Sequence, residues 1–160
     1  MDWSVALPNI WFLLITVLFT GFFVLEGYDF GVGVLAQLLG KDDIEKRVYF
    51  NTIGPFWDAN EVWLLTGGGA MFAAFPIWYG KLFSGYYIAF VLMLVALILR
   101  GVSFEFRGKL GDNRKWIKAC DFAMFIGSLL PPVLWGVAVA NFMTGANLDQ
   151  GKNLVDGFLG

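Results

Sequence analysis

The chain has no histidine and only one cysteine, Cys120, among its 160 residues. Without histidine it offers no His-ligated haem, no histidine-based metal cluster and no histidine general base. One cysteine excludes an internal disulfide framework, and its ordinary use is that of a small packing residue. Five methionines remain as possible thioether ligands, but methionines in apolar chains usually fill space. If the protein takes part in redox chemistry, we therefore expect a partner to hold the cofactor.

Charged residues are also scarce. They make up 15% of the chain, whereas soluble domains carry about a quarter, and 58% of the residues are hydrophobic. The net charge of −2 comes without a basic block that could hold nucleic acid. This composition indicates an integral membrane protein.

Four long apolar segments cover approximately residues 8–38, 52–75, 79–104 and 116–143. Each has the roughly 20 residues that a helix needs to cross the hydrocarbon core, where backbone groups must bond internally. Pro131 and Pro132 should kink the last helix rather than end it. We therefore expect an all-α bundle of four transmembrane helices over residues 1–144. Residues 145–160 are expected to form an external, glycine-rich tail or the start of a loop.

Basic residues concentrate in the first and third predicted loops, which are residues 40–47 and 104–118. The basic residues of these loops are Lys41, Lys46, Arg47, Arg107, Lys109, Arg114, Lys115 and Lys118. The second predicted loop has only Lys81, and the N-terminal flank has none. The positive-inside rule then predicts that the first and third loops are cytoplasmic and that the N-terminus lies outside.

Residues 51–63 (NTIGPFWDANEVW) place Asp58 and Glu61 at the start of the second apolar segment. Glu26 and Asp29 lie in the first segment, and the predicted topology puts all four carboxylates in the cytoplasmic half of the membrane. Both pairs are spaced i, i+3, so each occupies one helix face. Ionisable residues at membrane depth are costly and usually mark an ion path, a proton path or a buried ion pair.

Two interpretations of this cluster remain open on chemistry alone. Carboxylates close together in a medium of low dielectric can hold and pass protons near neutral pH. Arg100 would offset one negative charge, and Asn51 and Asn60 could orient water molecules between the carriers. Alternatively, the cluster is a buried network that only fixes the register of the helices.

The glycines have a structural interpretation. Gly27, Gly31 and Gly33, and also residues 67–69, have the small-residue spacing that allows helices to approach closely. Most of the 17 Phe and 7 Trp are expected to face lipid or the core. An apolar groove for a quinone tail, or a route for O2, is the alternative.

Several long motifs resemble those of subunit II of the cytochrome bd quinol oxidase family. They are residues 27–33 (GYDFGVG), 51–63, 68–76 (GGAMFAAFP), 99–100 (LR) and 125–132 (FIGSLLPP). They cover all four predicted helices in order. The family's subunit II has eight helices in two halves, so the chain is similar to the N-terminal half.

This resemblance implies a subunit of a heterodimeric terminal oxidase in the bacterial plasma membrane, which oxidises quinol and reduces O2 to water. Two b haems and haem d would lie in subunit I, and a small single-helix subunit could accompany the complex. The chain itself would bind no cofactor or metal and would not be catalytic alone.

The resemblance also assigns roles to single residues. By match of motif, Asp29 and Asp58 are the family's membrane-embedded acids linked to proton uptake. Trp57, Trp63 and Arg100 match positions near the subunit interface. Glu61 is often an amide in the family, which makes it the weaker candidate beside Asp58. Two other classes stay open: a purely structural assembly subunit, and half of a proton-coupled transporter, which mid-membrane helix breaks would favour.

Overall fold

The computed structural model describes residues 2–111 and 113–145, so the expected external tail lies almost entirely outside the described residues. The described part is built from helices, without strands. They are α1 (Trp3–Leu39), α2 (Asp43–Ile53), α3 (Trp57–Ala74), α4 (Pro76–Gly85), α5 (Tyr87–Phe106) and α6 (Arg114–Thr144). The prediction of an all-α membrane protein is confirmed.

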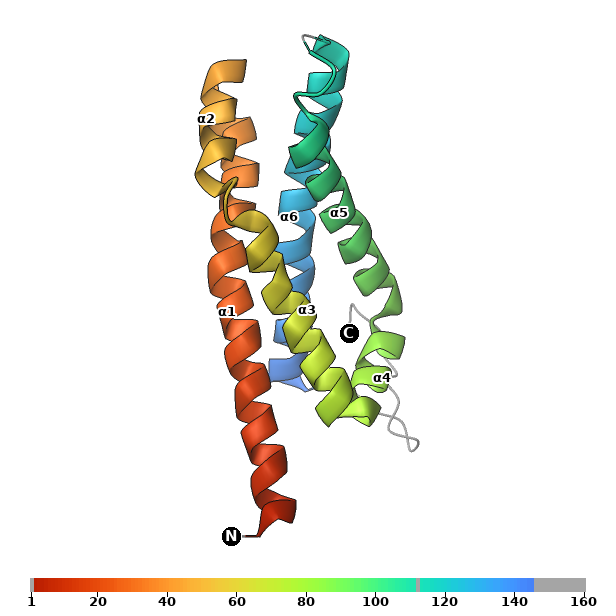
Figure 1. The fold of residues 1–160 in the computed structure, drawn as a ribbon. Coiled ribbons are helices and arrows are strands. Elements are labelled where there is room, and N and C mark those ends of the chain that lie inside the picture. Colours follow the sequence, from red (N-terminus) through yellow and green to blue (C-terminus); the bar gives the residue numbers. More distant parts are fainter. Residues whose placement is uncertain (1, 112, 146–160) are drawn as a thin grey trace.

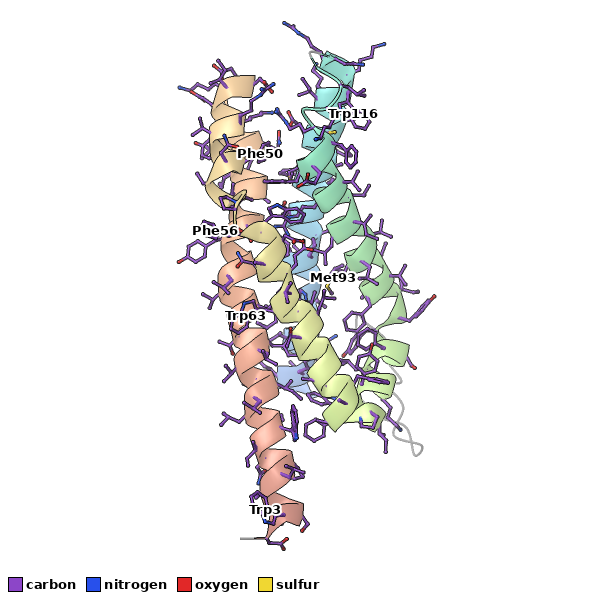
Figure 2. The ribbon with its side chains drawn as sticks, in the orientation of Figure 1. Trp3, Phe50, Phe56, Trp63, Met93 and Trp116 are labelled. Atoms are coloured by element: carbon purple, nitrogen blue, oxygen red, sulfur yellow. The ribbon has the colours of Figure 1, made fainter. Side chains whose placement is uncertain are left out.

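The helices form an elongated bundle (Figure 1). Along its long axis α1 and α5 run in one direction, and α3 and α6 run in the other. Helix α2 folds back beside the end of α1, while α4 joins α3 to α5 at the opposite end. Trp3 and Trp116 lie at opposite ends of the molecule (Figure 2), as expected for aromatic residues at the two membrane interfaces. We call the end that holds residues 40–47 and 107–118 the basic end.

The prediction of four membrane spans is not confirmed. Within the described residues, three helices are long and apolar enough to cross a membrane: α1, α5 and α6. The expected span 52–75 is divided between the end of α2, a turn at residues 54–56 and α3. The expected span 79–104 is divided between α4 and α5. Helix α3 also runs along the long axis of the bundle (Figure 1), but it is not among these three helices. Its first two turns contain Asp58, Asn60 and Glu61, which lower its mean hydropathy.

Local chemistry explains most of these boundaries. Asp42 caps α2 by accepting a hydrogen bond from the Glu45 amide, and Asn113 caps α6 in the same way. Phe75 leaves the helical region because a proline follows it, and Pro76 then starts α4, where no amide hydrogen is needed. Helix α6 continues through Pro131 and Pro132, as predicted.

Close helix packing depends on fewer glycines than expected. An added Cβ at Gly33 would collide with Ser128, and one at Gly67 would touch Phe19. The prediction is wrong for the other four glycines, since a Cβ would meet no atom within 4 Å at Gly27, Gly31, Gly68 and Gly69. A further close contact between helices is at Gly127, where a Cβ would lie 2.6 Å from the Ala96 carbonyl oxygen of α5.

Candidate functional site

Helices α1, α3 and α5 bring carboxylates and one guanidinium together inside the bundle. Glu26 on α1 and Arg100 on α5 form an ion pair, and their side chains are 0% and 1% exposed. Glu61 on α3 reaches the same guanidinium, with its Oε1 3.3 Å from Arg100 Nη1. The Arg100 guanidinium therefore joins Glu26 of α1 to Glu61 of α3, although these helices are far apart in the sequence.

Asp29 belongs to the same cluster through a different partner. Its side chain is buried, and its Oδ2 accepts a hydrogen bond of 2.8 Å from Asn60 Nδ2 of α3. The sequence predicted that Asn60 could orient water molecules between the acids, and the structure places its side chain in direct contact with Asp29. The Arg100 guanidinium carbon lies 4.8 Å from the centroid of the Phe30 ring, which adds a cation–π contact.

Among the described residues, Asp58 forms no hydrogen bond or ion pair with these three carboxylates or with Arg100. It is in the first turn of α3 and exposed, whereas Glu61, one turn further along, is half-buried and directed to Arg100. Asn51, at the end of α2, is also exposed. The structure thus brings together Glu26, Asp29, Glu61 and Arg100, and it leaves Asp58 exposed at the start of α3.

Trp57 and Trp63, which the resemblance placed near a subunit interface, also pack within this chain. The Trp57 ring lies 5.2 Å from the Phe104 ring, between α3 and α5. Trp63 lies against α1 where Gly21 leaves room, because a Cβ at Gly21 would be 2.5 Å from the indole. Both rings are half-buried, so each keeps part of its surface available outside the bundle.

A second ionic network at the basic end was not predicted. Arg107 is buried and donates from Nε to Asp121 Oδ1 at 2.7 Å and from Nη2 to Asp43 Oδ1 at 2.6 Å. Lys46 Nζ donates to Asp121 Oδ2 at 3.1 Å and to Gln37 Oε1 at 2.7 Å. The sequence marks Arg107 only as one of several loop cations, so its pairing could not be recognised there.

This network shifts the pKa of two of its members, Asp43 and Arg107. Burial alone would raise the pKa of Asp43, but hydrogen bonds and charges from Arg107 and Arg47 outweigh burial and hold that pKa below its ordinary value. Burial opposes the charged form of Arg107, yet its bonds to Asp121 and Asp43 raise its pKa further. Both groups therefore stay charged at neutral pH.

An apolar cavity of about 620 Å³ opens on the N-terminal side of Glu26. Side chains of α1, α3, α4, α5 and α6 line it, among them Phe19, Leu64, Phe83, Phe90 and Trp135. Its lining has the chemistry that either a quinone tail or dissolved O2 would need. The sequence predicted such a groove only as the alternative to ordinary aromatic packing.

Long apolar helices around a buried carboxylate–arginine cluster define a polytopic membrane protein with ionisable groups in its interior. A family model described as cytochrome bd terminal oxidase subunit II matches residues 7–160. The chain belongs to this family, which confirms the resemblance drawn from the motifs.

Individual relatives agree with the family. The chain is 56% identical over 149 residues to cytochrome bd ubiquinol oxidase subunit 2 of Bacillus subtilis, covering 93% of the chain and 44% of that protein. It is 47% identical over 152 residues to cytochrome bd-I ubiquinol oxidase subunit 2 of Escherichia coli K12, covering 94% and 40%. A probable cytochrome oxidase subunit 2 of Haemophilus influenzae is 49% identical over 136 residues, covering 85% and 36%. The chain thus spans less than half the length of these curated relatives.

The residues of this chain do not fit a haem. It contains no histidine, and its buried methionines Met71, Met93 and Met124 pack within apolar clusters. Within residues 2–111 and 113–145, no group of three or more acidic or cysteine side chains could hold a metal ion. We therefore assign no step of electron transfer to this chain.

Proposed function

We propose that this chain forms part of the non-haem subunit II of a bd-type quinol oxidase in a bacterial plasma membrane. The complex would oxidise quinol and reduce O2 to water, with two b haems and haem d in subunit I. This chain would stabilise subunit I and help to deliver cytoplasmic protons. Family membership supports the complex, and the buried cluster around Arg100 carries the proposed proton role.

The proposed path starts at Asp58 and uses groups that lie progressively deeper. Asp58 is exposed, Glu61 is half-buried, and Asp29 and Glu26 are buried. Glu26 Oε2 and Arg100 Nη2 have no hydrogen-bond partner within the described residues, so each can bind a proton-carrying group. Acids at graded depth beside one fixed cation can accept a proton from one side and release it toward the interior.

The direction of the path follows from the loop charges. We place the basic end in the cytoplasm and the N-terminus outside by the positive-inside rule. Protons consumed in making water would then come from inside, while protons from quinol would leave outside. The two events together would separate charge across the membrane.

A structural role is the second candidate, because the Glu26–Arg100 ion pair links α1 to α5. A half-transporter receives less support. Helix α1 runs unbroken past Glu26 and Asp29, whereas mid-membrane transport sites are typically formed by interrupted helices.

The substitution Asp58→Asn tests the proton role. We expect turnover of the purified complex to fall by about tenfold or more, in the range for losing a proton-transfer group, while haem content and yield stay close to normal. Glu105→Gln, which removes an exposed carboxylate at the basic end, is the matched control. Normal O2 consumption with intact haem would refute the carrier role, and joint loss of haem and complex would favour the structural one.

The membership of the complex needs its own measurement. A haem d absorption band should co-purify with the full-length chain in detergent, together with subunit I. A stable purified assembly without any haem would instead favour the transporter.

A further inference from the structure

The start of α6 gathers basic side chains that form no ion pair among the described residues. Four basic side chains are ion-paired: Lys46, Arg47, Arg100 and Arg107. Five others are exposed and form no ion pair within residues 2–111 and 113–145: Lys41, Lys109, Arg114, Lys115 and Lys118. Three of this second set, Arg114, Lys115 and Lys118, fall in the first two turns of α6.

Cations are in an electrostatically unfavourable place there. The N-terminus of a helix carries a partial positive charge and favours acidic residues, yet the first turn of α6 contains none. The Asn113 side chain accepts hydrogen bonds from the Lys115 and Trp116 amides. The exposed side chains of Arg114, Lys115 and Lys118 are therefore available to bind an external anion.

The same face of α6 continues as an apolar stripe. Phe122 lies one turn beyond Lys118, and Leu129 and Val133 follow on that face at helical spacing. Their side chains are 68%, 40% and 53% exposed, so the bundle does not cover them. Trp116, whose indole donates to the Phe106 carbonyl at 2.9 Å, lies among these cations, as expected for an aromatic residue near the membrane interface.

We propose that this face of α6 binds an anionic phospholipid. Arg114, Lys115 and Lys118 would hold its phosphate headgroup, and Phe122, Leu129 and Val133 would lie along an acyl chain. The order of charge and apolar surface along the helix matches the order of headgroup and tail in a lipid. A charged headgroup gains from every cation near the membrane surface, whereas a zwitterionic headgroup gains little.

The test uses the assembled complex with its full-length subunit, delipidated in mild detergent. Dioleoyl-phosphatidylglycerol or dioleoyl-phosphatidylcholine is added, and native mass spectrometry counts the retained lipids. We expect phosphatidylglycerol to be preferred and the preference to fall with salt. The K115Q/K118Q double variant should weaken phosphatidylglycerol binding by roughly tenfold or more, since each cation near the surface contributes to attraction.

The K41Q/K109Q double variant is the matched control, because it removes two exposed cations that lie off α6. It should change phosphatidylglycerol binding by less than about threefold, and K115R/K118R should preserve it. Equal losses in both double variants would overturn the proposal, because only net charge would then matter. It would also be overturned if unmodified complex held both lipids equally, or if K115Q/K118Q released a protein partner while phosphatidylglycerol binding stayed unchanged.

Discussion

The Glu26–Arg100 pair is the most deeply buried ion pair among the described residues. Both side chains are almost completely removed from solvent. Bringing two charges out of water costs several kcal/mol per ion, and their attraction compensates only while both are present. The pair therefore adds little net stability, but each of its two charges needs the other in order to remain buried.

Removing one member should expose this requirement. We expect Arg100→Gln to lower the free energy of unfolding by about 3–5 kcal/mol, because Glu26 is left buried without its counterion. Loss of the purified complex during stepwise denaturation measures this. The E26Q/R100Q double variant should recover a large part of the loss, since neither charge then remains.

Arg47→Gln supplies the comparison for an exposed ion pair. The side chains of Arg47 and Asp43 are 55% and 41% exposed, so breaking their contact should cost about 1 kcal/mol or less. Similar losses for Arg100→Gln and Arg47→Gln would contradict the argument from burial.

At the scale of elements, apolar runs predicted where helices exist better than where they end. The predicted apolar segments 8–38 and 116–143 lie within α1 and α6. Helix α6 also continues through its two prolines, as the sequence predicted. The break after Ile53 has a local cause in Gly54-Pro55, which the prediction passed over because the apolar run continues on both sides. The division at Tyr86 has no proline to mark it.

Pairing across the bundle could be anticipated only in part. Intramembrane acids stand out in any apolar sequence, so Glu26, Asp29 and Glu61 could be identified. Their partners could not, because Glu26 and Arg100 are 74 positions apart and no local pattern joins them. Arg107 was missed for the same reason, since its partners Asp43 and Asp121 lie on other helices.

The α5–α6 contact makes a prediction for one glycine. A Cβ at Gly127 would lie 2.6 Å from the Ala96 carbonyl oxygen and 2.7 Å from Arg100 Cβ. Gly127→Ala should therefore push α5 away from α6 and destabilise the fold by about 1–3 kcal/mol. Gly136→Ala on the same helix meets no atom within 4 Å and should be neutral or slightly stabilising. Thermal unfolding of both variants checks this, and an equal response would refute the packing argument.

For the molecule as a whole, the Arg107 network closes the basic end. Arg107 joins α2 to α6 through Asp43 and Asp121, and Lys46 extends the network to Gln37 of α1. Helix α2 has a short buried face with Phe50 and Ile53, so these ionic contacts add to a small apolar contribution. We expect the position of α2 to depend on the charge of Asp43.

This dependence predicts a response to acid. Because the folded protein lowers the pKa of Asp43, the unfolded chain binds its proton more readily, and the carboxylate stabilises the fold above its ordinary pKa of 3.8. That contribution is lost as the pH falls through the lower folded-state pKa. Asp43→Asn should thus be less stable than the unmodified protein at pH 7, by about 1 kcal/mol because the side chain is 41% exposed.

The difference between Asp43→Asn and the unmodified protein should shrink as the pH falls below about 4, where the native carboxyl also becomes neutral. Denaturation of the detergent-purified complex at a series of pH values measures it. Arg107→Gln should remove most of the same pH-dependent difference, because the guanidinium is the main charge that holds Asp43 ionised. If the difference stayed constant between pH 7 and pH 3, the charge of Asp43 would contribute nothing to the stability of the fold, and the predicted dependence of α2 on that charge would be wrong.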